Sequence, residues 1–278
     1  MLKVSEDKEQ FLSDFQDVDW ALLSAPPGAG KTFLAIYAAG EMLSHIYSRP
    51  HQQAILLTFS RLAKNKLREE KARLEEEGLV PRSAARRIKI FNHHSFWWLL
   101  VLRHHGFLDI PFPHIATRSE IDEWNEKTLE QAADNDIAQP SNRARKIAEN
   151  CSLLHAFGYE TLGRSCEGAS QFPSFVEFCF KQRERWWKTG LLWYNDLPLL
   201  AHRLLERHPG VRTMLRTKYP FLLMDEFQDT TEAQWKVTEL FMPKKVLIMI
   251  DPAQSIHSWR GADPERRIQC YWQAAREG

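Results

Sequence analysis

Short apolar runs alternate with longer stretches of mixed polar and apolar residues along much of this chain. The apolar runs have the length of strands and occupy residues 20–25, 53–59, 88–92, 221–224 and 245–250. Helical patterns cover residues 4–17, 31–47, 61–77 and 97–104. Continuous apolar runs are typical of strands that are buried on both faces. Strands that alternate with helices therefore predict an α/β fold, in which helices flank a parallel sheet.

The segment 106–190 has a different character. It contains polar, helix-like stretches with several Pro and Gly, and it shows no clear buried strand. We therefore expect a mostly helical insertion over 106–190. Residues 1–105 and 191–278 would then form one lobe around the sheet. Two tryptophan pairs, Trp97–Trp98 and Trp186–Trp187, fit helix packing better than exposed stacking platforms.

Composition limits the class of protein. The 278 residues are 44% apolar and 26% charged, which is ordinary for a soluble globular chain. The net charge of +1 means that any nucleic-acid site must be a local patch. The segment 61–89 has the densest basic residues, but several Glu dilute them. A solvated helix and a DNA-facing helix therefore both remain open for that segment.

The cysteines and the hydropathy indicate a cytoplasmic protein. Cys151, Cys166, Cys179 and Cys270 form no CxxC pair and have no histidines at zinc spacing, so we expect reduced thiols. No apolar stretch approaches the roughly 20 residues that span a bilayer, and the N-terminus is too polar for a signal peptide. We expect no membrane partner.

A phosphate-binding loop is predicted between the first strand and the next helix. Its glycines would let the backbone fold closely around phosphate oxygens, and the helix would add its positive N-terminal end. A lysine would reach the β- and γ-phosphates, and a threonine hydroxyl would ligate Mg²⁺. The loop predicts ATP and Mg²⁺ as cofactors and consists of Ala25, Pro26, Pro27, Gly28, Ala29, Gly30, Lys31 and Thr32.

Two carboxylates follow the apolar run 221–224. Ligands of open α/β sheets bind beyond the carboxyl ends of strands, which is where Asp225 and Glu226 would lie. Asp225 would hold Mg²⁺, and Glu226 would orient and polarise the attacking water. A helix-capping role is compatible with this assignment, because Asp229 or Thr230 could begin the next helix.

Several further blocks of the sequence are more specific than a phosphate loop and an acidic strand end. Asp225 to Thr230 reads DEFQDT. The other blocks are Gln10, Thr58–Ala63, Phe91–Phe96, Tyr194–Leu200 and Asp251–Ala262. Together and in this order, these blocks resemble the UvrD/Rep type of superfamily 1 DNA helicases. The resemblance implies a RecA-like ATP-binding lobe with an inserted subdomain.

The resemblance also implies roles for matching residues. Gln10 would read adenine, Gln254 would sense the γ-phosphate, and Arg260 would pair with phosphate or with an acid. Catalysis would therefore depend on Lys31, Glu226, Gln254 and Arg260. Gln228 would link the nucleotide to the DNA side. Single-stranded DNA would contact Phe59, Arg61, His94 and Trp259, although a core role stays open for Phe59 and Trp259.

Some positions depart from the family pattern. Phe33 stands where many relatives have an arginine near the nucleotide, which puts one contact in doubt. No block of a second RecA-like lobe is recognised, so we expect that lobe to be absent. ATP hydrolysis would then drive DNA translocation only in a complete protein or with a protein partner. The alternative is a nucleotide-regulated DNA-binding module without translocation, and a metabolic kinase fits the blocks poorly. Repair, recombination, replication and phage defence remain open as pathways.

Overall fold

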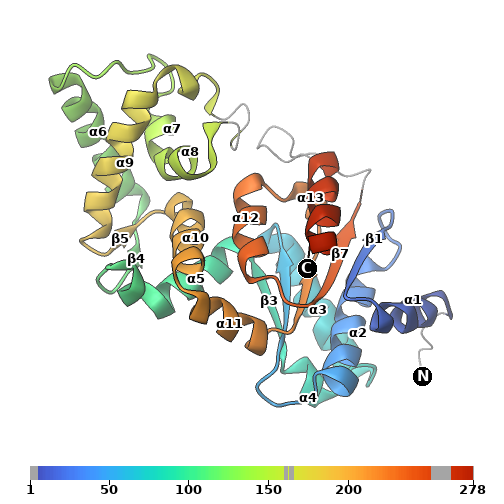
Figure 1. Cartoon of the computed structure of the whole chain (residues 1–278). Helices are drawn as coiled ribbons and strands as arrows, with labels where there is room; N and C mark the ends of the chain where they lie inside the picture. The colour runs from blue at the N-terminus through green and yellow to red at the C-terminus, as the bar shows by residue number, and fades with distance from the viewer. Residues whose placement is uncertain (1–5, 160–161, 163–165, 252–263, 278) are drawn as a thin grey trace.

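The computed structural model describes residues 6–159, 162, 166–251 and 264–277 (Figure 1). Its centre is a five-stranded, fully parallel sheet with the strand order β1-β7-β6-β2-β3. The strands are β1 (Trp20–Ser24), β2 (Ala54–Thr58), β3 (Ile88–Asn92), β6 (Phe221–Met224) and β7 (Lys245–Ile250). Each predicted apolar run forms a strand, so the predicted α/β fold is confirmed.

Alternate strand residues enter two separate cores. Leu56 and Leu223 face a cluster formed with the first helices, whereas Leu57 and Leu222 face the opposite cluster. Both faces are apolar because both are covered, which explains the uninterrupted runs. One face is covered by α1 (Glu6–Asp17), α2 (Lys31–Glu41), α3 (Arg61–Glu76) and α4 (Arg82–Ala85). The other is covered by α5 (His93–His104), α10 (Leu197–Arg207), α11 (Pro209–Lys218), α12 (Glu232–Phe241) and α13 (Pro264–Glu277).

Helix boundaries follow local capping chemistry. Ser60 caps α3, and Asn92 forms a capping box with Ser95, so α5 begins four residues before Trp97. Asp229 and Thr230, which could have begun the next helix, do not cap it. Residues Phe227–Asp229 form a 3-10 turn, and the cap of α12 is Thr231, whose hydroxyl accepts from Gln234 N. The pattern over 31–47 is an α-helix to Glu41 and a π-turn over Met42–Ile46.

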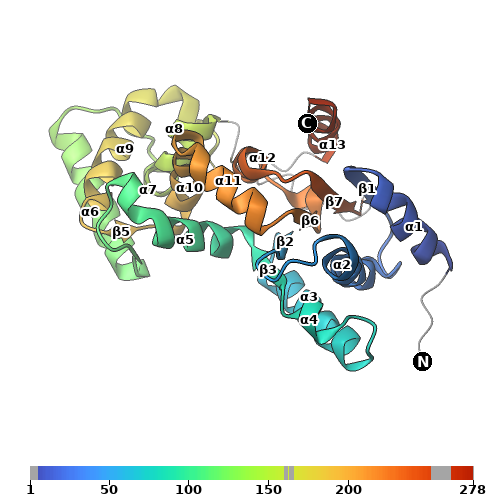
Figure 2. The same ribbon diagram turned by 60° about the horizontal axis from the view of Figure 1, so that its bottom comes forward.

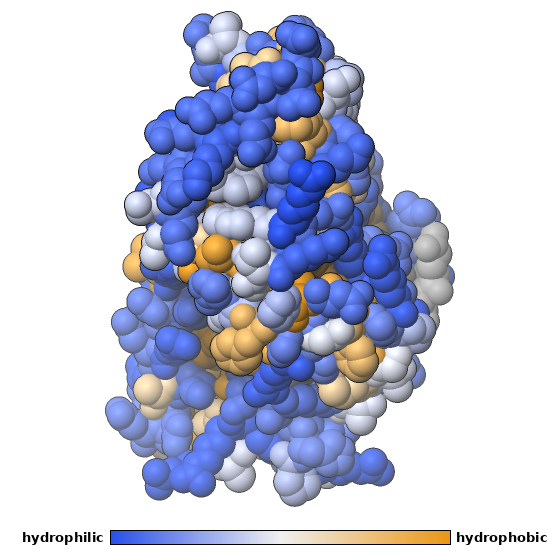
Figure 3. All heavy atoms as spheres, turned by 90° about the vertical axis from the view of Figure 1, so that its left-hand side faces the viewer, coloured by the Kyte–Doolittle hydropathy of each residue, from blue (hydrophilic) through white to orange (hydrophobic). Residues whose placement is uncertain are grey.

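The segment 106–190 is mostly helical, as predicted. It lies beside the sheet in Figure 1, and its outer face is largely hydrophilic with separate apolar patches (Figure 3). Its helices are α6 (Arg118–Asp134), α7 (Ala144–Glu149), α8 (Cys151–Phe157) and α9 (Pro173–Trp187), with 3-10 turns at His105–Leu108 and Ala169–Gln171. A short parallel ladder that the sequence did not reveal pairs β4 (His114–Ile115) with β5 (Leu191–Leu192).

A buried charge network anchors the return from this segment, where a 3-10 turn (Tyr194–Asp196) precedes α10. Arg183 and Asp196 are both fully buried and form an ion pair at 3.8 Å. Asp196 also accepts hydrogen bonds from Ser152 Oγ at 2.6 Å and from Trp187 Nε1 at 2.9 Å. These bonds offset the cost of burying a carboxylate.

The tryptophan pairs pack as helix residues. Trp97 and Trp187 are buried, and Trp98 and Trp186 are partly buried against the same core. Trp186 also stacks on Trp124 with ring centroids 5.9 Å apart. The four cysteines are free thiols, in agreement with prediction. Among the described residues, no helix combines the length and the apolar character that crossing a bilayer requires.

Candidate nucleotide site

The loop after β1 has the backbone that a phosphate cradle requires. Gly28 and Gly30 have φ values of 78° and 80°, a region that side chains with a Cβ rarely adopt. Gly30 precedes α2, whose first residue is Lys31, so the positive end of the helix lies at the loop. Lys31 Nζ donates to Ala25 O at 2.6 Å and to Pro26 O at 3.1 Å, and it lies 3.2 Å from Asp251 Oδ2. The loop therefore holds its lysine close to the tips of β1 and β7.

The acids after β6 are held in a defined arrangement. Glu226 adopts a left-handed conformation with φ 54°, which costs about 1–3 kcal/mol in a residue other than glycine. Its side chain accepts a 2.6 Å hydrogen bond from Gln228 Nε2, and Gln228 Oε1 accepts from Asp251 N at 3.0 Å. Gln228 therefore links the Glu226 carboxylate to the tip of β7.

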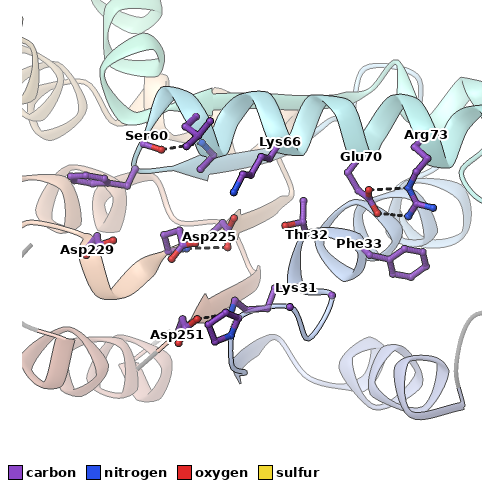
Figure 4. A pocket seen from close by; sticks show the side chains of 17 residues that line it. Lys31, Thr32, Phe33, Ser60, Lys66, Glu70, Arg73, Asp225, Asp229 and Asp251 are labelled. Atoms are coloured by element: carbon purple, nitrogen blue, oxygen red, sulfur yellow. Dashed lines mark hydrogen bonds and ion pairs between the residues drawn. The ribbon is translucent and has the colours of Figure 1, made fainter. Parts of the chain in front are cut away.

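One pocket joins the phosphate loop to these acids. Figure 4 shows Lys31, Thr32 and Asp225 around the same space, with Lys66 on the helix above. One side of α3 forms that wall of the pocket. The lining residues are Pro27, Gly28, Gly30, Lys31, Thr32, Phe33, Phe59, Ser60, Leu62, Ala63, Lys66, Glu70, Arg73, Asp225, Glu226, Asp229 and Asp251.

The electrostatics of the pocket favour a bound cation. Burial first, and then the neighbouring Glu226 charge, raise the pKa of Asp225 from its ordinary 3.8 to about 6. The Glu226 amide and Lys31 only partly offset this rise. At neutral pH the Asp225 carboxylate is therefore ionised in a place that disfavours its charge, and a divalent cation would relieve that cost.

Some pocket residues could not be identified from the sequence. Lys66, Glu70 and Arg73 lie on α3 and line the pocket, although in the sequence they belong only to the charged segment 61–89. Their spacing of four and three residues places them on one side of a helix. Arg73 is held by Glu70 and Glu77, with its nearest contacts at 2.6 and 2.9 Å, and its guanidinium lies 6.0 Å from the Phe33 ring centroid.

The structure brings most of the expected loop residues to the pocket, but not all of them. Ala25, Pro26 and Ala29 belong to the loop and do not line the cavity. Gln10 is exposed on α1, where its amide donates to Asp14 Oδ1 at 2.8 Å, and it does not line the cavity either. Gln254, Trp259 and Arg260 lie outside the described residues.

The described residues that were expected to contact DNA lie in different surroundings. Phe59 lines the pocket and is partly buried, while Arg61 is exposed at the start of α3. His94 is partly buried and makes edge contacts with Trp97 and Tyr194, at centroid distances of 5.1 and 6.4 Å. Burial lowers the pKa of His94 to about 4, so its ring is neutral at pH 7.

Comparison with known proteins decides the family. The sequence profile of the UvrD/REP helicase N-terminal domain matches residues 9–271. The chain belongs to this family. As a UvrD/REP helicase N-terminal domain, it contains the motor-domain fold that carries the phosphate loop and the acidic strand tip. Members of this family use ATP.

Individual relatives match shorter segments. The chain is 38% identical over 81 residues to "ATP-dependent DNA helicase Rep" of Salmonella typhimurium, covering 28% of this chain and 12% of that protein. It is 34% identical over 107 residues to "Exonuclease/helicase subunit RexA" of Lactococcus lactis subsp. cremoris, covering 38% and 9%. It is 35% identical over 91 residues to "RecBCD enzyme subunit RecB" of Buchnera aphidicola, covering 31% and 8%. The matched part is thus about an eighth or less of each of these relatives.

Proposed function

We propose that this chain is the ATP-binding lobe of a DNA helicase motor. In the complete protein, or with a partner that supplies a second lobe, ATP hydrolysis would be coupled to movement along single-stranded DNA. The observation that supports this most is the single pocket shared by Lys31, Thr32, Asp225 and Glu226. Residues 1–105 and 191–278 would form the lobe, and 106–190 would form a helical insertion.

The residues present fit magnesium-nucleotide chemistry. The loop amides would bind the phosphates, and Lys31 would exchange its carbonyl partners and Asp251 for phosphate oxygens. Thr32 and Asp225 would hold Mg²⁺, which would supply positive charge to neutralise the phosphates. The described residues contain no group of three or more His, Cys, Asp or Glu that suits a metal. A cation held largely by phosphates and water needs no such group.

Glu226 would orient and polarise the attacking water. Its bond to Gln228 fixes the carboxylate relative to β7, so Gln228 would act as a positioning residue. Charge in the transition state would be stabilised by an arginine of the second lobe, a contribution worth about 10³ to 10⁵ in rate in related phosphoryl transfers. This lobe alone should therefore hydrolyse ATP slowly.

Two substitutions test the assignment. Lys31→Ala should abolish binding of Mg-ATP in calorimetry, because it removes the cation that faces the phosphates. Glu226→Gln should retain binding and remove hydrolysis in the complete assembly. Lys127→Ala serves as a control, because that exposed lysine is far from the loop in sequence and pairs only with Glu123 among the described residues. The proposal is wrong if the unchanged chain binds no nucleotide, or if turnover survives Glu226→Gln.

A further inference from the structure

The helix α3 has two charged sides, and only one of them faces the nucleotide pocket. At about 100° per residue, Lys64, Arg68 and Lys71 project roughly opposite to Lys66, Glu70 and Arg73. The buried residues Leu67 and Leu74 lie between the two sets and face the sheet. Lys64, Arg68 and Lys71 therefore point away from the pocket, toward the side of the lobe where β3 forms the edge of the sheet.

The basic residues on this side continue around the sheet edge. Burial first, and then the charge of Lys89 and more weakly that of Arg68, lower the pKa of Lys71, whereas Glu75 raises it, so these charged groups act on one another. Burial, Arg103 and Lys89 likewise lower the pKa of Lys218. Hydrogen bonds also place two of these lysines. The Lys71 side chain donates from Nζ to Ala85 O just before β3, and the backbone amide of Gln53 donates to Lys218 O. We call this set the β3-edge row; it consists of Lys64, Arg68, Lys71, Lys89, Lys218 and Arg103.

These cations differ from those of the insertion. Among the described residues, no member of the β3-edge row forms an ion pair within 4.0 Å, although Glu75 acts on Lys71 at longer range. In the insertion, Arg118, Lys127 and Lys181 each pair with a neighbouring carboxylate. These three cations of the insertion are thus neutralised by their neighbours, whereas the row presents a positive potential that a polyanion would satisfy.

An exposed aromatic column lies at the end of the row next to Arg103. His104, Phe107 and His208 stack in sequence, with centroids 6.0 and 4.7 Å apart and ring planes inclined by 9° and 23°. Phe107 remains 56% exposed. Burial first, and then Arg103 and His208, lower the pKa of His104, so its ring is neutral at pH 7. Figure 2, which turns the underside of the molecule forward, shows α3, α5 and α11 on this side.

We propose that the β3-edge row and the aromatic column form a second binding surface for single-stranded DNA, separate from the strand tips around Phe59 and His94. Cations would contact successive phosphates, and the column would stack a base at its end, which is how sequence-independent single-strand sites work. Stacked rings favour a single strand over a duplex, whose bases are already paired. The proposal rests on the proposed function, because it assumes that the lobe acts on DNA.

The test measures affinity of the whole chain for a fluorescent oligothymidylate across salt concentrations. The triple variant Lys71→Gln, Lys89→Gln and Lys218→Gln should reduce the slope of log affinity against log salt by about 2, since each single-strand phosphate contact contributes about 0.7. If the variant and the unchanged chain bind equally at 1 M salt, this slope difference makes the variant bind about a hundredfold more weakly at 0.1 M salt. The matched control Lys127→Gln, Lys181→Gln and Lys236→Gln removes the same charge from ion-paired positions, with little change expected.

The column has its own test. Phe107→Ala removes the middle ring that holds His104 and His208 in the column, so the column should no longer stack a base at its end. Binding should weaken by about 5- to 150-fold, the range for loss of one stacked base. Phe107→Leu keeps an apolar side chain and should lose as much, because stacking requires the ring. Phe107 is exposed, so both variants should keep the melting temperature of the unchanged chain.

Separate outcomes overturn the separate claims. If the triple variant and its control bind alike, the row is not a DNA site. If variants of the row self-associate in size-exclusion chromatography but bind DNA with unchanged affinity, the role of Lys89 is only to keep the edge strand β3 from pairing with another chain. If the chain binds Mg-ATP but no oligothymidylate, the second surface is wrong while the nucleotide site stands. If it binds neither, the proposed function fails as well.

Discussion

Replacing Asp225 by Asn should stabilise the isolated chain while removing its binding of magnesium nucleotide. The carboxylate is buried and lies next to Glu226, and its pKa is raised from 3.8 to about 6. A difference of one in pKa corresponds to 1.36 kcal/mol, so ionised Asp225 costs the fold about 3 kcal/mol at pH 7.5. The amide carries no charge, and its oxygen can still accept from Glu226 N.

The pH dependence has a definite sign. Because the pKa of the folded state is higher than that of the unfolded state, the folded chain binds the proton more readily, and lowering the pH relieves the cost. The gain in unfolding free energy from Asp225→Asn should be about 3 kcal/mol at pH 7.5 and about 1.6 kcal/mol at pH 5. It should be small near pH 3.8. Other titrating groups are common to both chains and cancel in the difference.

Urea unfolding without magnesium or nucleotide, followed by tryptophan fluorescence at several pH values, measures this gain. Calorimetric titration with Mg-ATP measures the loss of binding. Asp122→Asn is a control, because that half-exposed carboxylate lies in a surface ion pair and should change stability little. If Asp225→Asn is no more stable than the unchanged chain at pH 7.5, the pocket does not hold a destabilised charge. A cation at this place would then have no electrostatic support.

Three further predictions concern the frame of the fold. Asp196→Ala should lower the unfolding free energy by about 3–5 kcal/mol, because it leaves Arg183 buried without a counter-charge, and adding Arg183→Met should restore part of the loss in thermal unfolding. Burial, and then the neighbouring His94, lower the pKa of His93 to about 3, so the unfolded chain binds this proton more readily and stability falls as the pH decreases from 7.5 to about 5. His93→Phe should remove this loss of about 2 kcal/mol in unfolding free energy, as measured by urea titrations. Thr231→Ala should cost about 0.5–2 kcal/mol of unfolding free energy in the same assay, through loss of the α12 cap.

The sheet was predictable because its inner strands β2, β6 and β7 are buried along their whole length. Burial on both faces favours continuous apolar residues, and the bounds of β6 and β7 agree with the runs at 221–224 and 245–250. The edge strand β3 is only partly buried, and its bounds also agree with the run at 88–92. The ladder of β4 and β5 could not be predicted, since each strand has two residues and its pairing depends on how the insertion folds back. Capping preferences placed the start of α12 only to within a residue or two, because Asp229, Thr230 and Thr231 are all good caps.

The pocket was predictable where chemistry demands rare residue combinations. Glycines followed by Lys31 and Thr32, and acids at a strand tip, have few other uses in that order. The α3 wall was not predictable in the same way. Its residues Lys66 and Arg73 are interleaved with Lys64, Arg68 and Lys71, and only the tertiary position of α3 tells which side faces the loop.

The core that lies beneath the sheet has a mechanical consequence. Leu222 of β6 belongs to the same buried cluster as Leu204 of α10 and Leu154 of α8, so packed side chains run without interruption from the sheet into the insertion. Close-packed interiors deform little and pass strain onward. A load applied to the insertion would therefore reach β6, the strand that ends at Met224 just before Asp225.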